Sequence, residues 1–100
     1  MSVLRRAYPH SLGQEEALRR VKTLFPKLEQ GDSVSGVRQI WEGNEVTFGF
    51  VVKGTIEIKG TITVDEHQIV LSADLPSYAK VSFDQIVSRE INALIQAQTV

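Results

Sequence analysis

The sequence predicts an α+β domain of two layers, in which two helices cover one face of an antiparallel sheet. Three observations lead to this prediction. Apolar residues recur with the period of a helix near the start of the chain and again near its end. From Val34 to Leu75 the period is two, which is typical of strands. Short polar breaks divide this middle stretch into the four strands of a meander.

Composition is that of an ordinary globular protein. A chain of 100 residues that is 42% apolar can bury a core, so we predict one domain over residues 1–100. The absence of cysteine excludes disulfides, thiolate metal sites and a cysteine nucleophile. No apolar run is long enough for a secretory signal or a transmembrane segment, so we expect a cytoplasmic protein. With a net charge of −1 and bases mixed among acids, no nucleic acid partner is indicated.

The chain opens with a short extended segment, Val3 to Tyr8, which we expect to join the sheet as an edge strand beside the last strand. That strand would raise the strand number from four to five. An amphipathic helix follows over about residues 13–29. Its apolar face is formed by four residues at helical spacing: Ala17, Val21, Leu24 and Leu28.

The start of this helix carries two alternative capping pairs, Ser11 with Gln14 or Gly13 with Glu16. Together with His10, Gly13 and Glu16 form a candidate helix-start motif.

Pro26 is the anomaly of the helix. In a helix interior it would remove a hydrogen bond at a cost of about 3 kcal/mol. We therefore predict a kink or a restart near Thr23–Phe25.

The breaks between the strands predict a register for the meander. Turns at Gly43-Asn44, Lys53-Gly54-Thr55 and Asp65-Glu66 give inward rows Trp41–Val46–Ile62–Ile69, Gln39–Phe48–Gly60–Leu71, Val37–Phe50–Ile58–Ala73 and Ser35–Val52–Ile56–Leu75. After the meander, a second helix is predicted from about Phe83 to Gln98, with Ser82 and Gln85 as its capping box. The element order is then β-α-β-β-β-β-α.

His10 lies between the first strand and the first helix, and two interpretations of it are open. It could hold an anion at the free N–H groups of the helix start, with Arg5 or Arg6 near. Alternatively, its ring hydrogen-bonds the turn and orients the strand toward the helix. We favour the second interpretation, because Glu15 and Glu16 already occupy the positive end of the helix and catalysis would need a partner group.

Gln39 and Gly60 share an inward row of the predicted sheet. A buried amide without a partner would cost about 1–3 kcal/mol, and a glycine within a strand often marks the close approach of another element. One interpretation is a small ligand cavity between sheet and helices, formed by Gln39, Trp41, Phe48, Gly60 and Leu71. The other, which we favour, is that the last helix packs over Gly60 while Gln39 lies at an open edge.

The outer face of the predicted sheet is mostly polar but carries Ile40, Val51 and Val70. In the predicted register, Ile40 and Val70 share a row with Thr47 and Thr61. Single exposed apolar residues are ordinary, but a row of them could be the interface of a homodimer.

Sequence motifs for catalysis are lacking. No Ser-His-Asp set, paired carboxylates or HExxH pattern is present, and His10 and His67 are too far apart in the sequence for a metal-site signature. We expect no catalytic residue, no metal ligand and no cofactor, and predict that the protein is not an enzyme.

The stretches "PHSLGQEEA", "WEGNEVTF" and "KGTITVDEHQIVLSADLP" resemble the polyhydroxyalkanoic acid system proteins of bacteria, over about residues 4–95. The matching positions are His10, Leu12, Gly13, Ala17, Trp41, Gly43, Phe48, Gly60, Ile62, Val64 and Leu75. Pro26 and the stretch "SYAKVSFDQ" depart from the family pattern. The element order is also similar to a reduced helix-grip fold, a fold of hydrophobic-ligand binders.

The resemblance implies a non-enzymatic accessory protein of the polyhydroxyalkanoate system that binds a protein partner or the polyester granule surface. The alternative is a protein that binds a small hydrophobic, acyl-like ligand in a cavity between sheet and helices.

Overall fold

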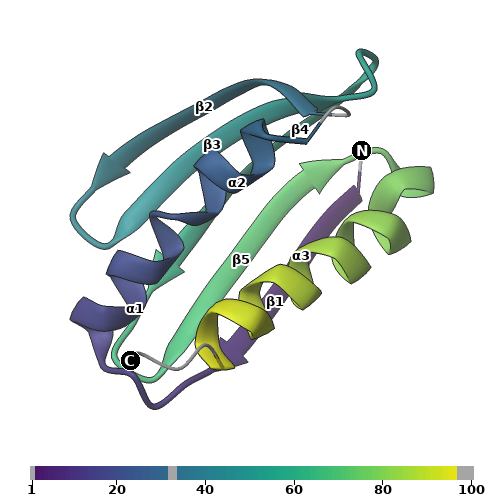
Figure 1. The fold of residues 1–100 in the computed structure, drawn as a ribbon. Helices are drawn as coiled ribbons and strands as arrows, with labels where there is room; N and C mark the ends of the chain where they lie inside the picture. Colours follow the sequence, from purple (N-terminus) through teal and green to yellow (C-terminus); the bar gives the residue numbers. More distant parts are fainter. Residues whose placement is uncertain (1, 32–33, 97–100) are drawn as a thin grey trace.

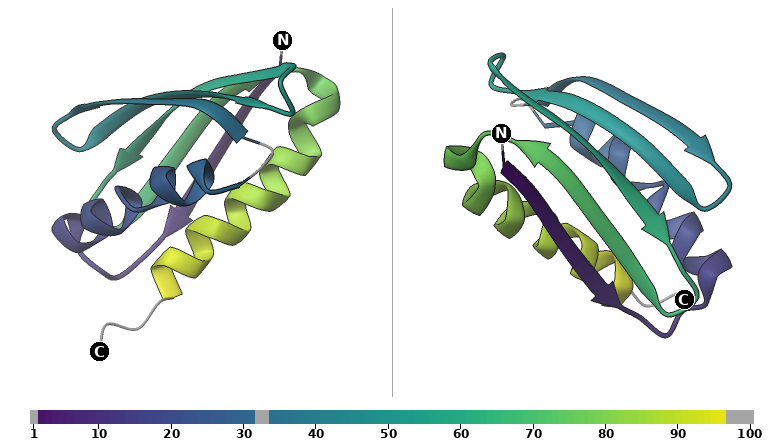
Figure 2. Two further views of the ribbon diagram at one scale, coloured as in Figure 1. Left: turned by 45° about the horizontal axis from the view of Figure 1, so that its top comes forward. Right: turned by 180° about the vertical axis from the view of Figure 1, so that it is seen from behind.

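The protein folds as one five-stranded antiparallel sheet whose helices all lie on the same face (Figures 1 and 2). The computed structural model describes residues 2–31 and 34–96. In chain order the elements are β1 (Ser2–Pro9), α1 (Gln14–Val21), α2 (Leu24–Glu29), β2 (Val34–Glu42), β3 (Glu45–Val52), β4 (Ile56–Val64), β5 (Gln68–Leu75), the 3-10 turn η1 (Ser77–Ala79) and α3 (Lys80–Gln96). The strand order in the sheet is β1-β5-β4-β3-β2, so the first strand pairs with the last, as predicted.

The predicted restart of the first helix is confirmed. Helix α1 ends at Val21, and Thr23 is the N-cap of a second helix, α2. Pro26 is the third residue of α2, within the first turn, where a backbone N–H has no partner inside the helix. The missing N–H of proline therefore costs no helical hydrogen bond at this position.

The β2–β3 hairpin keeps the predicted register near its turn, where Trp41 pairs with Val46. Farther along, a β-bulge between Ser35 and Arg38 shifts the register by one residue. Gly36 lies inside the bulge with φ +62°, a conformation that glycine adopts readily. The predicted pairs Val37–Phe50 and Ser35–Val52 are therefore wrong, and Val34 pairs with Val52 instead.

The β4–β5 register differs from the predicted one by two residues, since Ile62 pairs with Leu71 rather than Ile69. The turn lies one residue later than expected, because the N–H of Asp65 still donates to the carbonyl of Gln68 at 2.8 Å and extends the pairing. A shift of two residues leaves every side chain on its predicted face. The rows are displaced while the core face is kept.

Helix α3 begins earlier than predicted. Ala79 donates its N–H to the Pro76 carbonyl at 3.0 Å, and the η1 turn that this bond closes leads directly into α3 at Lys80. Ser82 and Gln85 consequently lie inside the helix, so the predicted capping box is wrong. The predicted end at Gln98 lies outside the described residues.

The core lies between the sheet and the helices. Its aromatic residues form a chain of neighbouring rings from the edge strand to α3: Trp41, Phe25, Phe48, Phe50 and Phe83, with centroids 5.7–6.5 Å apart. Phe25 of α2 is 1% exposed and lies between the rings of Trp41 and Phe48. The short helix α2 is thus anchored to the sheet by one ring.

Polar contacts fix α3 beside β1. Arg6 donates two hydrogen bonds to the Asp84 carboxylate at 2.9 and 3.1 Å, and this pairing lowers the pKa of Asp84. Ser88 donates to the same carboxylate and so accepts from the Tyr8 hydroxyl at 2.8 Å. Burial raises the pKa of Tyr8. In the described part of the chain, no helix is long and apolar enough to cross a membrane.

Candidate functional site

An apolar groove opens between the sheet and the helices at the end of the molecule where α3 begins. Its volume is about 230 Å³. The lining residues come from α2, three strands, the loop between β3 and β4, η1 and α3: Leu28, Val34, Phe50, Val52, Lys53, Ile56, Ile58, Ala79, Phe83, Ile86 and Val87. Ten of these eleven side chains are apolar, and Lys53 alone among them is charged.

The groove follows from the way the strands pair. Strand β4 pairs with β3 as far as Ile56, but its pairing with β5 stops at Lys59 opposite Asp74. The segment from Ile56 to Ile58 therefore belongs to the sheet on one side only. Helix α2 ends at Glu29, and the small side chain of Ala79 faces the same space. Apolar side chains of the sheet are left partly uncovered there.

Exposed apolar side chains also lie on η1 and on the first half of α3. Tyr78, Val81 and Ile86 are 76%, 67% and 47% exposed. Ile86 also lines the groove, so the two features meet at this residue. This end of the molecule presents apolar surface to the solvent.

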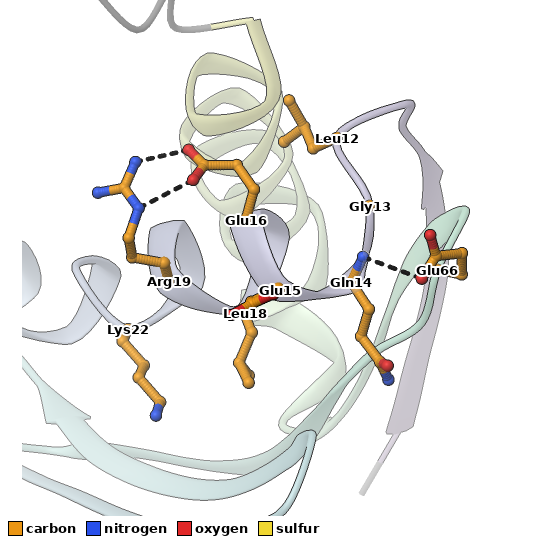
Figure 3. A pocket seen from close by; sticks show the side chains of 9 residues that line it. All are labelled: Leu12, Gly13, Gln14, Glu15, Glu16, Leu18, Arg19, Lys22 and Glu66. Atoms are coloured by element: carbon orange, nitrogen blue, oxygen red, sulfur yellow. Dashed lines mark hydrogen bonds and ion pairs between the residues drawn. The ribbon is translucent and has the colours of Figure 1, made fainter.

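A second hollow, of about 780 Å³, lies at the start of α1 and is lined mainly by polar residues (Figure 3). Its polar groups bind one another. The N–H of Gln14 donates to the carboxylate of Glu66 at 3.2 Å, and Arg19 donates to Glu16 (Figure 3). Arg20 also donates to Glu16, and hydrogen bonds from the two arginines lower the pKa of that carboxyl to about 2. The ion pair between Arg19 and Glu16 and the contact of Glu66 with the Gln14 N–H thus occupy part of its polar lining from within the chain.

The cap of α1 therefore differs from both predicted pairs. Gly13 is the N-cap with φ +81° and, being a glycine, has no side chain that could cap the helix. The capping carboxylate comes instead from Glu66 in the β4–β5 turn. Glu16 binds arginines, one of which, Arg20, is largely buried and donates to the carbonyl of Leu94 in α3 at 2.8 Å.

His10 joins the helix start to the same turn. The backbone N–H of His10 donates to the carbonyl of His67 at 2.9 Å, and the ring Nε2 lies 3.0 Å from the carbonyl of Asp65. Nδ1 accepts the N–H of Leu12 at 3.1 Å, so the neutral ring with its proton on Nε2 satisfies both contacts. His10 is 9% exposed, and both ring nitrogens bind the chain itself. This geometry supports the orienting role.

Replacing His10 with alanine is expected to lower the free energy of unfolding by about 1–3 kcal/mol, because the partly buried carbonyl of Asp65 and the partly buried N–H of Leu12 lose their partner. For a domain of this size, each kcal/mol corresponds to about 4–8 °C in melting temperature. Thermal unfolding followed by circular dichroism measures the change. An unchanged melting temperature would contradict the role that we assign to the ring.

The residues of the predicted cavity are not gathered around one space. Phe48 and Leu71 line a space of about 20 Å³ inside the core, whereas Gln39 is exposed at the sheet edge, where it accepts the indole N–H of Trp41 at 2.9 Å. At Gly60, the three atoms nearest to where a Cβ would lie belong to Ser72 and Ala73 of β5 and to the ring of Phe48, and none of the three comes from α3.

The three apolar residues of the outer face are also separated. Ile40 is 66% exposed and pairs with Thr47, while Val70 pairs with Thr63 and belongs to another row. The predicted shared row depended on the β4–β5 register that the structure corrects. Val51 lies farther along β3, opposite Ser35.

Comparison of the sequence with models of protein families shows the family to which this chain belongs. The family model described as "Putative polyhydroxyalkanoic acid system protein" matches residues 6–98. The chain belongs to this family. The resemblance indicated by the sequence is thereby confirmed, and residues 6–98 include the whole groove and the helix start.

Among solved structures, this polyhydroxyalkanoic acid system protein is similar to the Zhui aromatase/cyclase from Streptomyces sp. R1128. The TM-score is 0.56 at 9% sequence identity, and the match covers 94% of this chain and 91% of that chain. The likeness confirms the predicted helix-grip-like α+β fold. A comparison with curated proteins gives no match.

Sequence reasoning missed the groove of this family member because its residues look like ordinary core. Ile56 and Ile58 alternate inward as in any half-buried strand, and Ala79 lies in a stretch expected to be loop. A signal was present in Lys53, a long charged residue in a tight turn that favours glycine or asparagine.

Proposed function

We propose that the protein is a non-enzymatic, cytoplasmic accessory protein of the polyhydroxyalkanoate system that binds a short aliphatic acyl chain. The apolar groove between α2, α3 and the sheet is the observation that carries this proposal. Family membership supports a role in the polyhydroxyalkanoate system, and the apolar lining of the groove supports the binding of an aliphatic chain.

The size and the lining of the groove both favour a narrow aliphatic chain. Its volume of about 230 Å³ lies below the range of roughly 300–1,000 Å³ of sites for drug-sized ligands. The volume suffices for a short alkyl chain beside Phe50, Phe83 and Val87. Each buried methylene contributes about 0.8 kcal/mol, so a few of them suffice for weak binding.

The lining also supports a binding role over a catalytic one. Among the lining residues there is no histidine, carboxylate, serine or other nucleophile apart from the lysine at the edge. General acid–base catalysis needs a titratable group at the reacting atom, usually oriented by a partner.

A second candidate function is attachment to the surface of a polyester granule. The exposed side chains of Tyr78, Val81 and Ile86 favour it, because they present apolar area to the solvent on η1 and the first half of α3. Such a surface would not require a chain inside the groove.

Substituting Ala79 by leucine is expected to fill the groove and weaken the binding of 1-octanol at least about tenfold, equivalent to about 1.4 kcal/mol. Isothermal titration calorimetry of the full chain measures the affinity. Ala93→Leu makes the same change at an exposed position of α3 and is expected to leave the affinity unchanged.

Three outcomes are informative. Absence of octanol binding by the natural chain, or equal affinities of the two variants, would overturn acyl binding in the groove. Pelleting with polyester particles distinguishes granule attachment from acyl binding. If the protein attaches to the granule surface, it would still pellet with the particles as the Ala79→Leu variant, but not when Tyr78 and Val81 are both replaced by serine.

A further inference from the structure

We infer that the acyl chain held by the groove ends in a carboxylate, and that the ammonium of Lys53 binds this group. The inference rests on the proposed function, since it names the class of the ligand. It predicts selectivity for aliphatic acids over neutral aliphatic molecules of the same length.

The first argument is the distribution of charge. Lys53 lies in the loop between β3 and β4 and is the charged residue among the eleven that line the groove. No carboxylate of the lining offsets it, and within the described residues no acidic side chain forms an ion pair with it. Lys53 lines the groove, so its ammonium lies within one side-chain length of the apolar lining, and a cation so placed is complementary to an aliphatic chain with an anionic end.

The second argument is the backbone of Lys53. Its φ is +54°, and no other non-glycine residue in the described ranges has a positive φ. A side chain in this region is uncommon, and it carries a cost that glycine or asparagine would reduce. Lys53 and Gly54, with φ +54° and +72°, are the two central residues of the β3–β4 turn, which the N–H of Thr55 closes by donating to the carbonyl of Val52 at 3.2 Å. A hairpin turn of this kind needs a positive φ at both positions, so the turn explains the backbone of Lys53 but does not explain the choice of lysine over glycine or asparagine.

The competing explanation is that Lys53 serves packing alone. Lysine often lays its methylene stem along apolar surface while its ammonium stays in water. In that case the stem would contribute equally to every aliphatic ligand, and the charge would contribute to none. A substitution that keeps the stem and removes the charge separates the two explanations.

The test compares sodium octanoate with 1-octanol at pH 7, where the acid is ionised. The natural chain is expected to prefer octanoate. Lys53→Met, which keeps an apolar stem at the same backbone position, is expected to weaken octanoate binding about fivefold more than it changes octanol binding, as for a favourable exposed ion pair. Lys53→Arg should retain the preference. Raising the salt concentration should reduce the preference in the natural chain, because exposed charges are screened.

Lys59→Met is the matched control, since it removes an exposed lysine of β4 that pairs with Glu57 and does not line the groove. It is expected to change neither affinity. Equal binding of octanoate and octanol by the natural chain, or equal effects of Lys53→Met on both, would overturn the carboxylate inference while acyl binding stands. If neither compound binds, both the inference and the proposed function fail.

Discussion

Replacing Gly60 with valine is expected to lower the free energy of unfolding by about 3 kcal/mol or more, the upper end of what overpacking costs. A Cβ at this position would lie 2.3 Å from the carbonyl oxygen of Ser72 and 2.9 Å from the Cα of Ala73, both in β5. Backbone atoms of a paired strand cannot move aside as a flexible side chain can. The substitution therefore forces β4 away from β5 beside the point where their pairing ends.

The smaller change Gly60→Ala isolates the backbone clash, and Gly31→Ala is its matched control. At Gly31 a Cβ would meet its nearest neighbour, the Leu28 carbonyl, at an ordinary 3.4 Å. We expect the Gly31 variant to stay within about 0.5 kcal/mol of the natural chain and the Gly60 variant to be clearly destabilised. Urea unfolding measures both. A stable Gly60→Val protein would show that β4 and β5 are not paired here as described.

Phe25→Ala is expected to cost about 3–5 kcal/mol, as large-to-small changes of buried aromatic residues do. The ring of Phe25 contacts those of Trp41 and Phe48 and anchors the six-residue helix α2 to the sheet. Trp41 is the single tryptophan of the chain, so its fluorescence reports directly on this contact. We expect its emission to shift to longer wavelength as water reaches the indole.

Phe25→Leu serves as the control for this prediction, because it keeps an apolar side chain against Trp41 and should recover most of the stability. Urea unfolding of the two variants gives the free energies, and emission spectra of the folded proteins give the environment of Trp41. Equal stability of the alanine and leucine variants would contradict the anchoring role of the ring.

Much of the architecture could be predicted because its signals are local. The alternation of apolar residues indicated the strands and their inward faces, and Pro26 indicated the division of the first helix. The register was predictable only where a turn determines it. Gly43 and Lys53-Gly54 indicated the β2–β3 and β3–β4 turns, but the polar stretch after Val64 contains no glycine to mark its turn, and the predicted turn at Asp65-Glu66 lay one residue too early.

The remaining differences come from contacts between distant parts of the chain. The cap of α1 is supplied by Glu66, more than fifty residues beyond the helix start, and no local pattern indicates it. The groove lies where the pairing of β4 with β5 ends, at Lys59 opposite Asp74, and no local sequence pattern indicates where two strands stop pairing. The sequence indicated Gly60 as special, and its true role is close strand packing rather than the floor of a cavity.

The bulge at Gly36 has a consequence for the behaviour of the protein at high concentration. Strand β2 is an outer edge of the sheet, and its free backbone groups could template a strand from another molecule. The extra residue between Ser35 and Arg38 interrupts the regular spacing of these groups and increases the local twist. A second chain finds only the short run from Arg38 to Glu42 in regular spacing, with a charged residue at each end. We therefore expect the β2 edge to resist pairing with other molecules into β-aggregates. The exposed apolar side chains near the start of α3 lie on another element and are not affected by the bulge.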